Sequence, residues 1–198
     1  MSEVQTFTVA GVSFPVEYVY SYLVPKKEVD LRYVMAVKQL ARAMLRKAII
    51  EKGEKVENYV FRDLLPTTDL NVGTNEEWKF SVTAGENTII NITLPDEKHI
   101  VFYGLAYIDT TPRITKLEFY KGTAEAIAVF QLEPMLVQDE PVVYFRMPII
   151  YKSGDNIVVR ATATERDDAE KLVILGLVAE KKGKIIAGKK IIDISGVI

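Results

Sequence analysis

Residues 145–159, FRMPIIYKSGDNIVV, form an apolar run that stops at a turn and resumes as a second apolar run. Pro148 interrupts the first run, and the second consists of β-branched residues. The SGDN segment is typical of a tight turn, because Gly, Asn and Asp tolerate a positive φ. The stretch therefore predicts a strand, a turn and a returning strand, and the same rhythm extends over most of the chain.

Eight strands of this kind are predicted between residues 76 and 180. They cover residues 78–82, 88–94, 99–108, 114–120, 126–132, 142–151, 157–164 and 171–180. Short strands separated by turns, with no helical period between them, indicate an antiparallel sandwich or barrel. An immunoglobulin-type domain would carry a Trp in its third strand, but Trp78 opens the first. We therefore predict a mainly β protein with an eight-stranded antiparallel jelly-roll sandwich at residues 76–180.

The residues outside the predicted sandwich divide into four segments. Residues 1–29 are rich in β-branched and aromatic residues, which predicts an extended N-terminal arm. In residues 30–53 apolar residues recur at steps of three and four, which predicts an amphipathic helix that begins at Asp30 and ends at Gly53. Residues 54–75 are a turn-rich connector that admits a short strand at 56–61. Residues 181–198 are a β-prone C-terminal arm, which either joins the edge of its own sheet or docks on a neighbouring subunit.

The predicted helix is strongly basic. Residues 31–52 hold six Lys or Arg and one acid, Glu51, so they carry a charge of +5, while the whole chain carries −2. At 100° per residue, Arg32, Arg42, Arg46 and Lys47 gather on the side away from the apolar face. A solvated face is one interpretation. Because like charges at this spacing repel without compensating acids, we expect instead that these four residues contact an anionic surface: nucleic acid, lipid or an acidic partner.

The residue types that carry most enzyme and metal chemistry are scarce. The chain has no Cys and one His, which excludes disulfides, thiolate metal sites and cupin-type His clusters. His99 is expected to be a partly exposed strand residue. Asp167 and Asp168 could help to hold Ca²⁺, but a solvated loop is the simpler interpretation. We therefore predict a protein that is not an enzyme, with no catalytic residues, no cofactor and no metal site.

The amino-acid composition indicates a globular protein from a thermophile. An apolar fraction of 48% with 26% charged residues is that of a globular protein. The longest apolar run, residues 172–179, is too short to cross a bilayer, and the N-terminus lacks the pattern of a secretory signal. Few Asn and Gln residues, beside abundant Lys, Glu, Val and Ile, are typical of proteins from thermophiles.

The strand pattern, most clearly in residues 145–159, resembles the single jelly-roll capsid proteins of tailless icosahedral viruses of thermophiles, including archaeal viruses that contain a membrane. The resemblance covers residues 76–180. It implies a location in the virion and self-assembly with other capsid subunits into an icosahedral lattice. It also implies that the N-terminal arm and the basic helix face the interior, toward anionic lipid or nucleoprotein, and that the protein has no small-molecule substrate.

A second function class stays open from the sequence alone. A β-sandwich can also be a recognition module that binds carbohydrate or a cell-surface partner. Tyr18, Tyr20 and Tyr22 share one face of a predicted strand and would be its contact surface. A tyrosine face that packs against the sandwich or a neighbour is the simpler interpretation.

Overall fold

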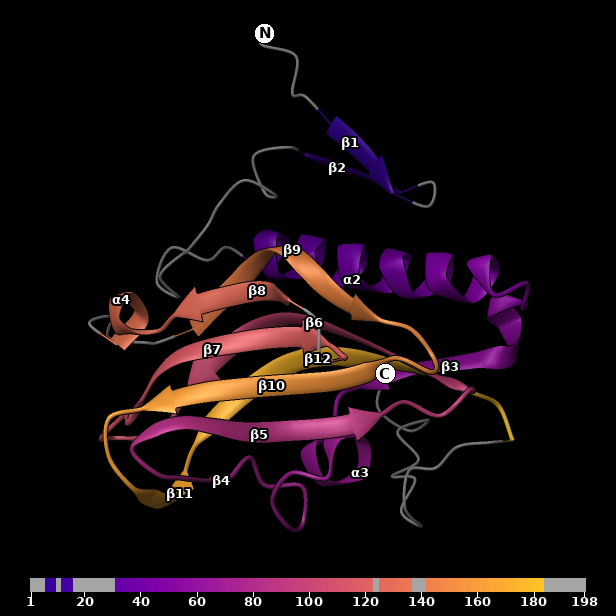
Figure 1. Ribbon diagram of the computed structural model, residues 1–198. Helices are drawn as coiled ribbons and strands as arrows, with labels where there is room; N and C mark the ends of the chain where they lie inside the picture. The colour runs from indigo at the N-terminus through magenta and orange to yellow at the C-terminus, as the bar shows by residue number, and fades with distance from the viewer. Residues whose placement is uncertain (1–5, 10–11, 16–30, 123–124, 137–141, 184–198) are drawn as a thin grey trace, which may run out of the picture.

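The computed structural model describes residues 6–9, 12–15, 31–122, 125–136 and 142–183 and shows two four-stranded sheets stacked face to face (Figure 1). One sheet has the strand order β3-β12-β6-β9, and the other has the order β5-β10-β7-β8. The bounds are β3 Tyr59–Asp63, β5 Gly85–Thr93, β6 Lys98–Tyr107, β7 Ile114–Lys121, β8 Ala126–Gln131, β9 Val142–Tyr151, β10 Asn156–Ala163 and β12 Leu172–Lys181.

The strand order defines the class of fold. Counted one to eight along the chain, the strands of the sandwich read 1-8-3-6 in the first sheet and 2-7-4-5 in the second. All neighbouring strands in both sheets are antiparallel. Two interlocked Greek keys with this order form a jelly roll, so the predicted fold class is confirmed.

The first strand of the roll lies earlier in the chain than predicted. β3 falls in the segment 54–75, which the sequence assigns to a connector, and it pairs with β12. The strand predicted at 78–82 exists as β4, Phe80–Val82, but it pairs with β11, Asp167–Glu170, in a separate two-stranded ribbon. β3 is short and contains Arg62 and Asp63. Its sequence therefore lacks the apolar alternation by which the longer strands are recognised.

The larger apolar cluster fills the space between the two sheets. Phe102 of β6 lies with its ring centroid 5.7 Å from that of Phe119 and 5.5 Å from that of Tyr151. Phe102 faces this cluster, whereas its neighbours Val101 and Tyr103 face a second cluster on the other side of the sheet. Successive side chains of a strand point to opposite faces. Burial of both faces therefore explains why residues 100–107 of β6 carry no charged side chain.

Helix α2, Leu31–Glu51, covers the outer face of the β3-β12-β6-β9 sheet (Figure 1). Its buried residues in the second cluster are Tyr33, Val37, Ala41, Leu45 and Ile49. Gly53 has a φ of +79°, and the backbone N–H groups of Gly53 and Glu54 donate to the carbonyls of Ile50 and Ile49. This pair of bonds is a Schellman cap, which needs a residue that tolerates positive φ. The predicted helix is confirmed, and it ends at Glu51 with Gly53 in the cap that stops it, whereas Asp30 lies outside the described residues.

The remaining elements are short. β1, Thr6–Val9, and β2, Val12–Pro15, pair as an antiparallel hairpin next to α2. The others are the 3₁₀ helix η2, Val56–Asn58, and the helices α3, Pro66–Leu70, and α4, Glu133–Leu136. The other residues of the predicted N-terminal arm, including the three tyrosines, and the C-terminal arm after Gly183 lie outside the described residues. The role of both arms stays a prediction.

A buried ion network joins α3 to three strands of one sheet. Arg62 of β3 donates to both carboxylate oxygens of Asp69 at 2.6 and 2.7 Å and also pairs with Glu180 of β12. Lys98 of β6 lies 2.8 Å from Asp69 and 2.9 Å from Glu180. Burial alone would raise the pKa of Asp69, but the hydrogen bonds and charges of Arg62 and Lys98 outweigh burial and hold this pKa below its usual range. Two cations and two acids balance within the network.

Candidate functional site

The side of α2 that faces away from the sheet is the candidate functional surface. Met35, Gln39, Arg42, Arg46 and Ile50 are exposed on it, and we call this set the α2 stripe. At 100° per residue, the five side chains fall within about 80° of the helix circumference, and they span about 22 Å of helix length. Met35 is 51% exposed and Ile50 is 59% exposed. The stripe is therefore both basic and apolar, unlike a purely solvated face.

The basic residues of α2 differ in how far their charge is compensated. Nζ of Lys47 lies 3.8 Å from Glu51, and Nζ of Lys38 lies 3.8 Å from Asp63. Arg42 and Arg46 make no ion pair with any residue in the described part of the chain. Among the basic residues of α2 whose side chains the structure describes, the two arginines therefore carry the charge that no ion pair compensates.

The structure separates the four residues that the sequence predicts as an anionic-surface contact. Arg42 and Arg46 lie together in the α2 stripe. Lys47 lies at the flank, where Glu51 also accepts a hydrogen bond of 2.6 Å from Lys152 of the loop after β9. The hydrogen bond and charge of Lys152 lower the pKa of Glu51. Arg32 lies in the first turn of α2, with a side chain outside the described part. The contact with an anionic surface stays a prediction for all four.

The chemistry of the α2 stripe suits a surface rather than a small molecule. A guanidinium group binds phosphate through two parallel N–H groups, and it is weakly hydrated compared with an ammonium group. Exposed Met and Ile beside arginines are typical of a helix that lies flat on a charged and partly apolar surface. Among the helices in the described ranges, none has the length and apolarity to cross a membrane.

A second exposed surface lies on β8 and β9, one edge strand from each sheet. β8 and β9 are edge strands of their sheets, and they adjoin each other through Phe130 and Phe145, whose rings stack at 4.3 Å. On the outside of β8, Ile127 is 49% exposed and Val129 is 46% exposed, and on β9 Met147 is 57% exposed. A cavity of about 240 Å³ lies between the two strands. Exposed β-branched residues on a free strand edge are typical of a surface that pairs with another chain.

His99 is buried rather than partly exposed, which corrects the prediction from the sequence. It is 1% exposed, and its Nδ1 accepts a hydrogen bond of 3.2 Å from the backbone N–H of Ser153. Its ring packs against Tyr59, with centroids 5.8 Å apart. Burial, followed by the charge of Lys52, lowers the pKa of His99 to about 4. His99 is therefore a neutral core residue at neutral pH, and its pattern in the sequence, at the start of a strand beside Lys98, gives no sign of burial on both faces of the sheet.

The acidic pair Asp167 and Asp168 is divided between two environments. Asp168 accepts hydrogen bonds from Arg166 at 3.1 Å and from Ser81 at 3.3 Å. Asp167 lies instead beside Asp109 and Glu170. The sequence gives no local signal for this grouping, because Asp109 follows β6 and is distant along the chain from the other two.

Comparisons with known proteins find likeness in structure only. No protein-family model and no curated protein matches the sequence. Among solved structures, a protein of Bacillus endospore appendages, which form disulfide-linked pili, matches with a TM-score of 0.33 and 12% identity over 63% of this chain and 88% of its own. VP2 of infectious bursal disease virus, from a subviral particle, matches with a TM-score of 0.33 and 9% identity over 69% of this chain and 36% of its own. Eiger TNF from S. frugiperda matches with a TM-score of 0.31 and 12% identity over 67% of this chain and 98% of its own.

These likenesses carry no argument about the function of the chain, because the TM-scores and identities are too low. The strand order defines the fold class, which is a single jelly roll. The basic helix α2 covers one face of it.

Proposed function

We propose that the chain is a structural shell subunit of a virus, whose jelly roll builds a closed icosahedral lattice of copies and other capsid subunits. The strand order carries the proposal. A jelly roll of eight strands is an architecture of capsids, lectins and cupins. A cupin needs several histidines in its barrel, and the chain has only one. The thermophile-type composition extends the proposal to a virus of a hot-living host.

The edge strands β8 and β9 support self-association. Ile127 and Val129 on β8 and Met147 on β9 are apolar side chains that stay exposed on these two edge strands. A shell repeats one subunit many times, so each interface can be modest when every subunit makes several. The arms at 1–29 and 181–198 would add contacts by exchange between subunits.

The α2 stripe supports an orientation of the subunit within the shell. An uncompensated pair of arginines favours contact with phosphate, which the contents of a virion supply as nucleoprotein or anionic lipid. We therefore assign the face covered by α2 to the inner side. Arg32 and Lys47 would join Arg42 and Arg46 in this contact.

Size in solution tests the shell proposal. The full chain is expected to sediment as large closed particles, or as capsomers that associate further as concentration rises. A chain that stays monomeric at high concentration and binds sugars on a glycan array would contradict the shell and support a recognition module. In residues 33–122, 125–135 and 142–183, for which the structure describes side-chain burial, no aromatic side chain is exposed to form a sugar platform. Tyr18, Tyr20 and Tyr22 are the residues that the recognition module would use to contact sugars.

Charge reversal tests the inner-face assignment. The variant Arg42→Glu with Arg46→Glu is expected to form particles with less phosphate-containing material inside, and wild-type retention of that material should fall as salt rises. The matched control is Lys55→Glu with Arg166→Glu, which makes the same charge change at two exposed positions outside α2. Equal contents in the two variants would contradict the assignment. Adding Arg32→Glu and Lys47→Glu extends the test to all four residues.

A further inference from the structure

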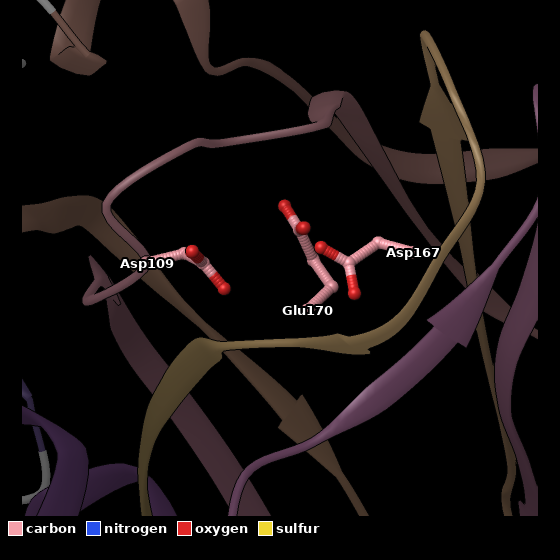
Figure 2. Close-up of side chains that lie close together, drawn as sticks. All are labelled: Asp109, Asp167 and Glu170. Carbon is pink, nitrogen blue, oxygen red and sulfur yellow. The ribbon is translucent and has the colours of Figure 1, made fainter.

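Three carboxylates converge at one end of the sandwich (Figure 2). Asp109 comes from the segment between β6 and β7, Asp167 from the start of β11, and Glu170 from its end. One carboxylate oxygen of each residue lies within 4.8 Å of those of the other two. The fold, rather than a local sequence motif, brings these acids together.

Glu170 has one carboxylate oxygen with a hydrogen-bond partner and one without among the described residues. Its side chain is fully buried, and its Oε1 accepts hydrogen bonds from the Tyr107 hydroxyl and from the backbone N–H groups of Arg113 at 2.7 Å and Ile114 at 3.2 Å. Its Oε2 is also buried and has no hydrogen-bond partner in the part of the chain that the structure describes. In Figure 2 the carboxylate of Glu170 lies between those of Asp109 and Asp167. A buried carboxylate oxygen without a partner is unfavourable, so the cluster calls for a group that this oxygen can bind.

No side-chain cation of the described residues neutralises the cluster. Asp109, Asp167 and Glu170 make no ion pair there, and the hydrogen bonds that the two aspartates accept come from backbone N–H groups. Arg113 donates its backbone N–H to Glu170 but directs its guanidinium group to Glu165 at 3.1 Å. Three adjacent carboxylates held only by neutral donors repel one another unless a cation lies between them.

The size of the cluster fits Ca²⁺. If all three oxygens were separated by the full 4.8 Å, the centre of their triangle would lie about 2.8 Å from each, close to the Ca–O distance of about 2.3–2.6 Å. The donors are all carboxylate oxygens, whereas zinc and copper prefer nitrogen and sulfur ligands. Ca²⁺ accepts irregular geometry and completes its shell with water, whereas Mg²⁺ requires a near-ideal octahedron.

We propose that Asp109, Asp167 and Glu170 bind one Ca²⁺ ion, which joins the β6–β7 segment to β11. A Ca²⁺ site here differs from the expectation of no metal site. Of the acidic pair Asp167 and Asp168, only Asp167 would be a ligand. It does not depend on the shell function.

Calcium titration of the full chain, after treatment with a chelator, tests the proposal. Calorimetry is expected to give one Ca²⁺ per chain, and the unfolding temperature should rise by about 5–10 °C when Ca²⁺ exceeds Kd a hundredfold. Tb³⁺, which replaces Ca²⁺, should give emission sensitised by Tyr107, because the Tyr107 hydroxyl contacts Glu170. Mg²⁺ at equal concentration should shift the unfolding temperature much less.

Single-residue variants locate the site. Asp109→Asn and Asp167→Asn remove ligands that are only partly buried, so the fold should survive while Kd for Ca²⁺ rises at least about tenfold. Asp168→Asn is the matched control, because this neighbour faces Arg166 and Ser81 instead, and it should bind Ca²⁺ as the wild type does. No binding by the wild type at millimolar Ca²⁺, or unchanged binding by Asp109→Asn, would overturn the proposal.

Discussion

Acidification from pH 8 to pH 5 should destabilise the protein through its one histidine. In the buried ring of His99, Nδ1 accepts the hydrogen bond of Ser153, so the proton of the neutral form sits on Nε2. Protonation would break that bond and place a positive charge at a buried position, with Lys52 and Lys152 among the charges that act on it. Burial is the main cause that lowers the folded-state pKa of His99 to about 4, against about 6.5 for His in an unfolded chain.

The sign and size of the effect follow from these two pKa values. Because the folded-state pKa of His99 is the lower one, stability is fully present above about pH 6.5 and is lost as the pH falls toward 4. At pH 8 this residue is neutral in both states, whereas at pH 5 the unfolded chain binds almost one more proton there than the folded chain. The free energy of unfolding should therefore fall by about 2 kcal/mol over this range.

Guanidinium chloride unfolding of the wild type and of His99→Gln, at pH 8, 7, 6 and 5 and constant ionic strength, measures the effect. Carboxylates titrate in both proteins, so the difference between their pH profiles isolates His99. The wild type should lose about 2 kcal/mol more than the variant between pH 8 and pH 5. Parallel profiles would refute the burial of a neutral imidazole at this position.

Three further predictions concern stability, each measured by chemical unfolding. Asp69→Asn removes the acid that pairs with buried Lys98 and partly buried Arg62, so it should lower the free energy of unfolding by about 3–5 kcal/mol. Leu45→Ala empties a fully buried position between α2 and the sheet and should cost about 2–5 kcal/mol, whereas exposed Arg46→Ala should stay within about 0.5 kcal/mol. Gly104→Ala would place a Cβ 2.5 Å from the backbone carbonyl oxygen of Val143 and should cost about 1–3 kcal/mol. Wild-type stability of Asp69→Asn, Leu45→Ala or Gly104→Ala would contradict the contacts described at that residue.

The long elements could be predicted from the sequence because their patterns are set locally. The apolar spacing of residues 31–51 and the Gly at 53 define α2 and its end, and the turn at 152–155 separates β9 from β10. β3 could not be assigned to the roll in this way, because a five-residue strand with Arg62 and Asp63 in it gains its place from pairing with β12. Strand pairing depends on residues that are distant along the chain.

The sites show the same division between local and non-local signals. The arginines of the α2 stripe are visible in the sequence because helical spacing brings Arg42 and Arg46 to one side. The burial of His99 and the cluster of Asp109 with Asp167 and Glu170 are not visible, because each depends on how separate strands meet in the folded chain.

Electron cryomicroscopy of the particles formed by the full chain would show which face of each subunit lines the interior. We expect a closed shell of jelly rolls in which the helix-covered face of the β3-β12-β6-β9 sheet, with the α2 stripe, lines the inner surface. A chain that forms no particles, or a shell with α2 on its outer surface, would contradict this expectation.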